Sequence, residues 1–467
     1  MSSNSENHLD NEDSNYIYIN NKRIEYHKSD LISFYEDLLQ RLKSENLHSR
    51  SLDIFAHAMH EHLQNPFKYN YCHEAAAEGD LIELKKMHQH GLPLFWYPEE
   101  EYRDDYKLCT IEAARYGHLD CLKYAHENGC EWNSDLIAYA AENGHFDCLR
   151  YAFENGCQTS EYTTASAAEG GNLDCLRYVH ENGCEWDSYT SSEAAENGHL
   201  DCLRYIHENG CEWDESTTSS AAKNGHLDCL KYAHENGCEW NEYTTYYAAE
   251  NGHLDCLRYA HENGCAWHEA TTSQAALNGH LDCLRYAHEN GCAWHEETTM
   301  NAVSQSYSIK IKEKKYLDCL RYAHENGCEL HEETTSTAAK NGLLDCLKYA
   351  HENGCPWDER TTSSAAGNGH LDCLRYAHEN KCPFVSESKT YSPDYIATTQ
   401  AARYGHTDCF RYAFENGCPF FQNLCRDVDD FCKQLYKDID SSKNIIKKSI
   451  NNQLNDNVIN HIITKYI

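Results

Sequence analysis

The chain has 467 residues, a formal net charge of −35 and 26 cysteines. So large a negative charge argues against binding to nucleic acid, whose phosphates require a basic surface, and against adhesion to anionic lipid. No apolar run approaches the ~20 residues that span a membrane. We therefore expect neither nucleic acid nor a membrane among its partners.

The first residues, MSSNSENHLDNEDSN, lack the basic and apolar regions of a signal peptide. We therefore expect an intracellular protein, cytoplasmic or nuclear, in a compartment where thiols stay reduced. Residues 1–28 are polar and are predicted to be a disordered tail. Residues 29–72 have helical periodicity, as in DLISFYEDLLQRLKSEN (30–46), and are predicted to be N-terminal helices that form a cap.

From residue 73 to 420 the chain repeats one short unit. The segment AAAEGDLIELKKMHQHG (75–91) is a degenerate copy, and eleven clear copies follow it. The cysteine of their LDCL element recurs every 27 residues, except at two steps that are nine residues longer: Cys121, Cys148, Cys175, Cys202, Cys229, Cys256, Cys283, Cys319, Cys346, Cys373 and Cys409. Residues 421–467 again have helical periodicity and are predicted to be a C-terminal helical cap.

Each unit is predicted to be a pair of helices. In GHLDCLKYAHENGC, the unit around Cys229, apolar residues cover most of the helix, and Gly237 suits the left-handed position that follows a helix. The preceding STTSSAAKNG predicts a shorter helix, which its Thr or Ser could cap and whose Ala221 and Ala222 permit close packing. Such a pair buries its apolar surface only against neighbouring pairs, so the sequence predicts an all-α solenoid.

The unit resembles the ankyrin repeat. The segment STTSSAAKNGHLDCLKYAHENGCEW (216–240) follows the family pattern of TPLHLAA, two residues, GH and an apolar helix ending in GAD. The resemblance covers roughly 73–420 and implies an ankyrin-like helix-pair solenoid. About six residues are missing between Trp240 and Thr244 relative to the family's usual length of about 33, so β-hairpin fingers are expected to be shortened or absent. Short, Cys-rich arrays of this kind are similar to those of large DNA viruses and protists, and a viral relative would act inside a host cell.

Three explanations compete for the repeated thiols and imidazoles, such as Cys229, His234 and Cys238: a metal site, a disulfide ladder or packing. Cys229 and His234 point about 140° apart on a helix, and the histidine position holds Phe153 and Phe414 in two copies, where metal binding is impossible. Equivalent positions on stacked helices are about 8–10 Å apart, too far for a disulfide. We therefore predict packing, with no metal and no cofactor.

Other repeated columns are interpreted in the same way. The tryptophan column, with Trp240 in one copy and Leu330 in another, is predicted to fill space between repeats. The tyrosine column, invariant in the eleven copies, is expected to pack its ring and extend its hydroxyl to a polar edge. The histidine of the GH pair, such as His253, is expected to hydrogen-bond to the backbone. Because a charged imidazole is costly to bury, the array should loosen below about pH 6.

A recognition surface should vary between copies, and three positions on one face of the first helix do so. In ankyrin-like arrays this helix lines the concave side. Exposed aromatic side chains favour interfaces, although unconstrained surface positions would also vary. The candidate partner-binding residues are Tyr139, Tyr162, Tyr189, Glu193, Tyr243, Tyr247, Gln274 and Asn301.

No phosphate loop, HExxH motif or nucleophile elbow is present, so we predict that the protein is not an enzyme. The leading hypothesis is a protein–protein interaction scaffold that binds a partner on the concave face of the array. One alternative is a substrate-recognition adaptor of a ubiquitin-ligase-type complex, in which the N-terminal helices recruit the ligase. The other alternative is a metal-binding or redox protein.

Overall fold

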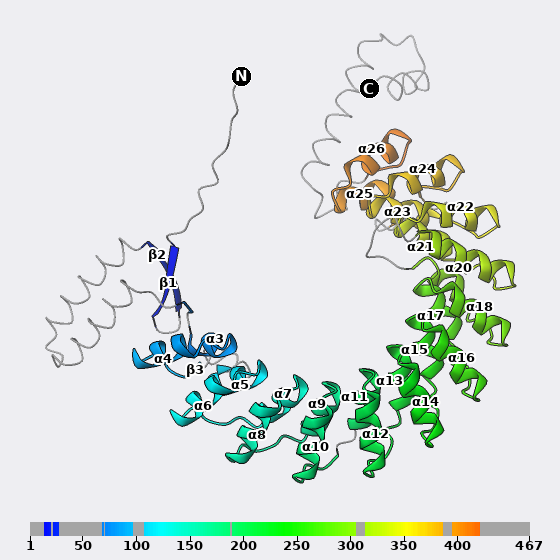
Figure 1. Ribbon diagram of the computed structural model, residues 1–467. Coiled ribbons are helices and arrows are strands. Elements are labelled where there is room, and N and C mark those ends of the chain that lie inside the picture. Colours follow the sequence, from blue (N-terminus) through cyan, green and yellow to red (C-terminus); the bar gives the residue numbers. More distant parts are fainter. Residues whose placement is uncertain are drawn as a thin grey trace, which may run out of the picture. The chain divides into compact units, whose positions relative to one another are not determined.

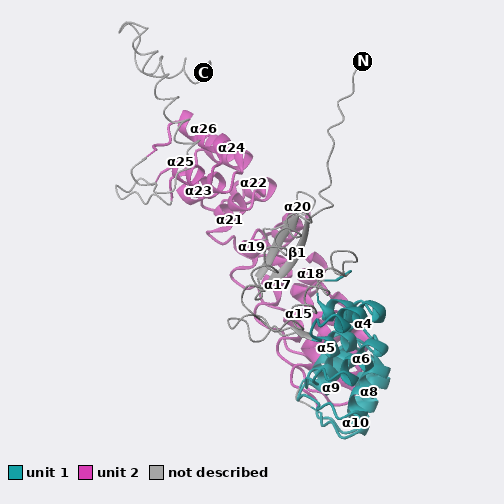
Figure 2. Cartoon of the chain, turned by 90° about the vertical axis from the view of Figure 1, so that its left-hand side faces the viewer, with its two compact units in different colours: residues 1–212 teal, residues 213–467 magenta. Residues whose placement is uncertain are grey.

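The computed structural model describes residues 14–19, 22–27, 68–69, 71–96, 107–186, 189–304, 313–385 and 395–420. The chain divides into two compact units, residues 1–212 and residues 213–467 (Figure 2). The N-terminal helices predicted before residue 68 and the cap predicted at 421–467 lie outside the described residues.

In the described part of unit 1, five helix pairs follow one another. Their helices are α3 (Cys72–Ala77), α4 (Leu81–Gln89), α5 (Cys109–Arg115), α6 (Leu119–Glu127), α7 (Leu136–Glu142), α8 (Phe146–Glu154), α9 (Thr163–Glu169), α10 (Leu173–Glu181), α11 (Thr190–Glu196) and α12 (Leu200–Glu208). The degenerate copy at 75–91 thus folds as the clear copies do.

In the described part of unit 2, seven pairs follow one another. Their helices are α13 (Thr217–Lys223), α14 (Leu227–Glu235), α15 (Thr244–Glu250), α16 (Leu254–Glu262), α17 (Thr271–Leu277), α18 (Leu281–Glu289), α19 (Thr298–Asn301), α20 (Glu313–Glu325), α21 (Thr334–Lys340), α22 (Leu344–Glu352), α23 (Glu359–Gly367), α24 (Leu371–Glu379), α25 (Ala397–Arg403) and α26 (Thr407–Glu415).

Within each unit the odd-numbered first helices form one row and the even-numbered second helices form another (Figure 1). Fully buried alanines such as Ala248 and Ala249 of α15 let the first helices approach one another more closely than the second helices do. On α16, Cys256, Leu257 and Ala260 form the buried stripe. The predicted helix-pair solenoid is therefore confirmed.

Turn chemistry ends both helices of each pair. The glycine after the second helix adopts the left-handed conformation, as at Gly237, where φ is +90°. Lys381 takes the same place in one repeat, with φ of +73°. The expected left-handed position after the second helix is thus confirmed.

Two short hairpins depart from the all-helical expectation. Strand β1 (Ser14–Ile19) pairs antiparallel with β2 (Lys22–His27), with Ile17 opposite Ile24. The predicted disordered tail at 1–28 is therefore wrong for these residues, because NYIYI and KRIEYH have strand propensity and two asparagines, which favour a tight turn, stand between them in the sequence.

The second hairpin is a short finger between the degenerate copy and the first clear one. Strand β3 (Phe95–Trp96) pairs with β4 (Lys107–Leu108). Glu83 and Cys121 are 38 residues apart, so this junction has the extra chain that a finger requires. Within the described residues the other junctions have no paired strands, which confirms shortened or absent fingers.

Candidate functional site

Histidine, tryptophan and tyrosine side chains join each repeat to the next. His261 Nδ1 lies 3.1 Å from the Tyr286 hydroxyl of the following repeat, and the His261 ring stacks on Trp267 with centroids 4.4 Å apart. The Trp267 indole N–H donates to the Asn290 carbonyl oxygen at 3.2 Å, and the Arg258 guanidinium lies 5.4 Å from the Tyr286 ring centre. The predicted packing role of these columns is confirmed.

The same contacts recur along both units. Hydrogen bonds of 2.9–3.1 Å join His88 to Tyr124, His126 to Tyr151, His180 to Tyr205, His288 to Tyr322, His324 to Tyr349, His351 to Tyr376 and His378 to Tyr412. Two of these bonds cross the longer steps of the array, so the register of contacts survives the nine-residue insertions. Where Phe153 replaces the histidine, its ring meets Tyr178 edge-on at 5.8 Å, and packing continues without a hydrogen bond.

The histidine of the GH pair occupies a second column between repeats. His199 Nε2 donates to the Glu169 carbonyl oxygen of the preceding repeat at 2.9 Å, so the expected backbone bond is confirmed. The preceding repeat leaves room for this ring with a glycine: a Cβ on Gly225, whose φ is +79°, would lie 2.5 Å from His253 Nδ1. These rings are therefore wedged between neighbouring turns.

Burial lowers the pKa of four histidines in this GH column: His145, His253, His280 and His370. In the other histidine column, burial lowers the pKa of His378. We therefore assign most of the expected acid sensitivity to the GH column, in which burial lowers the pKa of four rings rather than one.

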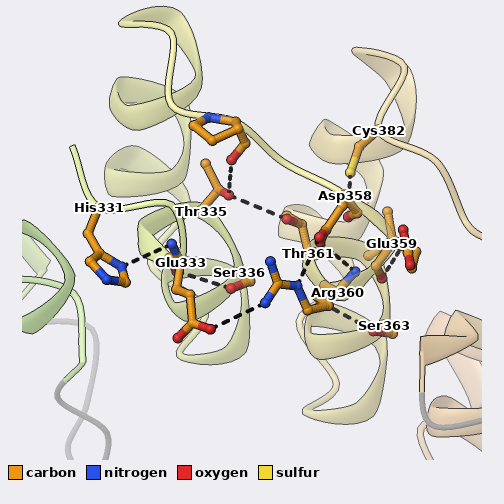
Figure 3. A network of polar contacts seen from close by, with 12 residues as sticks. His331, Glu333, Thr335, Ser336, Asp358, Glu359, Arg360, Thr361, Ser363 and Cys382 are labelled. Atoms are coloured by element: carbon orange, nitrogen blue, oxygen red, sulfur yellow. Dashed lines mark hydrogen bonds and ion pairs between the residues drawn. The ribbon is translucent and has the colours of Figure 1, made fainter. Parts of the chain in front are cut away.

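A ladder of buried threonines joins the first helices (Figure 3). Thr335 of α21 donates its hydroxyl at 2.8 Å to the Pro356 carbonyl, which follows the second helix of the same repeat, and lies 3.4 Å from the Thr361 hydroxyl of the next repeat. Equivalent bonds to the carbonyl that follows the second helix of the same repeat are made by Thr110, Thr164, Thr218, Thr245, Thr272, Thr299, Thr362 and Thr398. The carbonyl bonds thus tie together the two ends of one repeat, and the contacts between threonine hydroxyls join neighbouring repeats.

At the start of the first helix, the side chain that bonds to the backbone belongs to the residue two positions before the N-cap. The Asn241 side-chain oxygen accepts from the Tyr243 backbone N–H at 2.8 Å, and His268 Nδ1 accepts from Ala270 at 3.1 Å. The expected Thr or Ser cap is therefore wrong, because the threonine hydroxyl bonds instead to the carbonyl that follows the second helix of its own repeat.

The 24 cysteines in the described part of the chain form no disulfide, and most are buried. Burial raises the pKa of the Cys256 thiol to about 12 and that of Cys265 to about 11. Such thiols stay protonated near neutral pH and behave as small apolar side chains. Among the described residues no three His, Cys, Asp or Glu side chains converge in a geometry that could hold a metal.

In unit 1, the predicted binding residues with the greatest exposure are Tyr162 and Tyr189. They immediately precede α9 and α11, in the same position of consecutive repeats, and their exposed fractions are 57% and 55%. Tyr139 of α7 and Glu193 of α11 are half-buried. The Arg115 guanidinium lies 4.0 Å from the centre of the Tyr139 ring, so this position of the first helix accommodates a cation.

In unit 2, the structure brings Tyr243 and Tyr247 together with two residues that the sequence did not single out, Tyr246 and His268. The Tyr243 ring lies 6.0 Å from both other tyrosine rings and 5.0 Å from His268. Tyr246 lies 5.1 Å from Tyr247 and 5.2 Å from His268. We call these four residues the Tyr243 patch. The spacing of i, i+3 and i+4 in the sequence could have predicted its three tyrosines.

The last two predicted binding residues, Gln274 and Asn301, differ in their exposure. Gln274 is half-buried on α17, whereas Asn301 has an exposed fraction of only 9%. Asn301 is therefore wrong as a surface residue, because α19 ends there after four residues, whereas the equivalent residues lie inside longer helices. The sequence reasoning also missed Tyr116 and Tyr404, which are exposed where most copies have asparagine after the first helix.

A line of carboxylates runs along the C-terminal ends of three first helices in unit 1. Glu142, Glu169 and Glu196 end α7, α9 and α11. Burial, together with the charges of Glu142 and Glu196, raises the pKa of the Glu169 carboxyl. Helices α9 and α11 thus each have a glutamate at the C-terminal end and an exposed tyrosine at the N-cap.

Stacked helix pairs bonded only to their neighbours define a helical-repeat protein. The family model of ankyrin repeats, in three copies, matches residues 110–190, 191–271 and 218–301. Residues 110–301 of the chain are accordingly ankyrin repeats. No curated protein sequence matches it, so the expected likeness to arrays of large DNA viruses and protists stays a prediction.

A comparison with solved structures finds matches of low score. The human ASB11 ankyrin repeat domain is 20% identical over 42% of this chain and 84% of that chain, with a TM-score of 0.26. The pentatricopeptide repeat protein PPR10 in complex with an 18-nt psaJ RNA element is 12% identical over 94% and 73%, with a TM-score of 0.35. PPR10 from maize is 14% identical over 83% and 65%, with a TM-score of 0.31. Scores this low support no inference about ligands.

Among the described helices, none combines the length and apolar character that crossing a bilayer requires.

Proposed function

We propose that this protein is a non-enzymatic scaffold that binds a protein partner on the exposed face of its first helices, on the concave side of the array. Ankyrin repeats are in general protein-interaction modules, and the repeats here match that family. The 24 described cysteines, none in a disulfide, suit a reducing intracellular compartment.

One observation carries the proposal. Tyr162 and Tyr189 are more than half exposed. They belong to neighbouring helices α9 and α11, which pack against each other. Tyrosine supplies a large apolar area with a polar tip and is enriched at the centres of interfaces. Glu193 on the same helix would add a polar contact at the rim.

The chain itself supplies a substitution that suits this position. In the next repeat the equivalent residue is Ser216, so replacing Tyr162 and Tyr189 by serine should leave the fold intact. Tyr116, 52% exposed at the other end of a first helix in the same unit, provides the control.

The test is quantitative affinity capture from native cells with the full chain, its Tyr162→Ser/Tyr189→Ser variant and its Tyr116→Ser variant. We expect at least one partner to be recovered equally by the parent chain and Tyr116→Ser and about tenfold less by the double variant, at unchanged melting temperature. Equal recovery by all three proteins would remove the proposed surface.

A further inference from the structure

The Tyr243 patch presents clustered aromatic rings on one unit. Tyr243, with an exposed fraction of 41%, is the N-cap residue of α15, and Tyr246 and Tyr247 follow on the same helix. The Tyr243 and Tyr246 ring planes make an angle of 79°, and those of Tyr246 and Tyr247 make one of 88°. Rings at such angles offer both faces and edges to a ligand, so the patch is more than a single exposed side chain.

The surroundings of the patch are acidic. Residues 241–270 contain five acidic side chains and one basic side chain. Glu242 and Glu269, which directly follow Asn241 and His268 in the chain, are exposed, and burial together with the charge of Glu250 raises the pKa of Tyr246. His268 Nδ1 accepts a backbone hydrogen bond, so the imidazole in this arrangement carries no proton on that nitrogen.

Aromatic faces beside carboxylates attract cations, because the ring face is negative and the carboxylates add an attractive charge. The protein shows this preference within its own repeats. Tyr139, which stands four repeats before Tyr247, lies 4.0 Å beneath the Arg115 guanidinium. In the second helices, arginine or lysine side chains lie over tyrosine rings in repeat after repeat, as Arg258 does over Tyr286.

We propose that the Tyr243 patch binds an arginine or lysine side chain in a basic segment of the protein partner. This inference rests on the proposed scaffold function and names the chemistry of one contact. A basic segment matches the charge of the whole chain, which is −35, as well as that of the patch.

The test uses the full chain and two fluorescein-labelled nonapeptides made of glycine and serine, one with three arginines and one with three citrullines in their place. Citrulline keeps the shape of arginine without its charge. Binding is measured by fluorescence anisotropy at about 0.15 M salt, where weak long-range attraction between exposed charges is screened beyond about 8 Å. The variants are Tyr243→Leu, which removes the ring, and Tyr243→Phe, which keeps it.

Tyr404→Leu is the matched control, because Tyr404 is 61% exposed in the same unit. We expect Tyr243→Leu to weaken binding of the arginine peptide about three- to tenfold, and Tyr243→Phe and Tyr404→Leu to change it less than twofold. The citrulline peptide should respond to none of these substitutions. An equal response to Tyr243→Leu and Tyr404→Leu would show nonspecific electrostatic attraction and would overturn the inference.

The partner captured in the earlier experiment separates this inference from the proposed function. If Tyr243→Leu lowers capture of that partner but leaves binding of the arginine peptide unchanged, the scaffold function stands and the cation-binding role is wrong. If neither Tyr243→Leu nor Tyr162→Ser/Tyr189→Ser lowers capture, the scaffold surface itself is wrong, whatever the peptide does.

Discussion

The Tyr205 hydroxyl lies 2.9 Å from His180 Nδ1, across the boundary between two repeats. Tyr178 occupies the equivalent place one repeat earlier, but its partner there is Phe153, which has no hydrogen-bonding atom. Each tyrosine therefore meets a ring of the preceding repeat edge-on, but only Tyr205 has a hydrogen bond to that ring.

Tyr205→Phe should lower the free energy of unfolding of the array by about 1 kcal/mol, the usual net contribution of a neutral hydrogen bond. Tyr178→Phe should change it by less than about 0.5 kcal/mol, because no bond to the ring opposite is lost. Urea unfolding followed by circular dichroism measures both. Equal losses in the two variants would mean that the hydroxyl stabilises the array through something other than the histidine.

Gly225→Ala should be the most damaging of the small substitutions. The new Cβ would lie 2.5 Å from His253 Nδ1, and the residue would also have to keep a φ of +79°. Gly237→Ala would have to keep a positive φ but would not clash, since nothing lies within 4 Å of its Cβ position. We expect about 1 kcal/mol of backbone strain for Gly237→Ala and at least about 2 kcal/mol for Gly225→Ala. Thermal melts of the two variants side by side test the clash, and equal melting temperatures would contradict it.

Thr334 and Thr335 are adjacent, fully buried and different in bonding. Thr335 donates to the Pro356 carbonyl, whereas the Thr334 hydroxyl has no hydrogen-bond partner. Thr335→Val should cost about 1 kcal/mol, because it removes the bond to the Pro356 carbonyl, and Thr334→Val should be neutral or stabilising, because it removes an unpaired hydroxyl. Denaturant unfolding decides the order, and a less stable Thr334→Val would show that its hydroxyl is bonded in solution.

Acid should destabilise the array through the GH histidines. Burial lowers the pKa of His253 and His280 below the ordinary 6.5, and the nearby His226 and Lys315 lower it further. Between pH 6.5 and the lowered values, the unfolded chain therefore binds more protons than the folded one, so stability is full above about pH 6.5 and falls as the pH decreases.

The melting temperature should accordingly be lower at pH 5.5 than at pH 7.5. In the variant His253→Asn/His280→Asn this difference should shrink, and Asn172 shows that asparagine fits the position, where its side chain accepts from the Cys175 backbone N–H. An unchanged pH difference in the variant would assign the acid sensitivity to other groups.

The sequence predicted the repeat architecture because every internal contact is copied many times. A column that alternates His234 with Phe153 has to be a packing position, and the ring contacts of both residues confirm it. The threonine ladder was not predicted, since a Thr at a helix start can cap the helix or bond to a distant carbonyl, and only the position of the chain after the second helix decides between them. The β1–β2 hairpin occurs once and had no second copy to support it.

The sequence predicted only part of the candidate surface. Variation between copies located Tyr162, Tyr189 and Tyr243, but variation does not report exposure. Asn301 varies and is buried, whereas His268 belongs to the adjacent repeat and reaches the Tyr243 patch only through the stacking of α15 and α17.

The indole bond from Trp240 to the Asn263 carbonyl, 3.0 Å long, has a consequence for how such a gene can change. Removal of residues 244–270 in one step would set Trp240 against Asn290, which is the same kind of acceptor in the same place. A protein whose junctions are interchangeable can gain or lose whole modules by unequal recombination without redesigning any of them. The length of the surface that such an array offers to a partner can therefore change in steps of 27 residues.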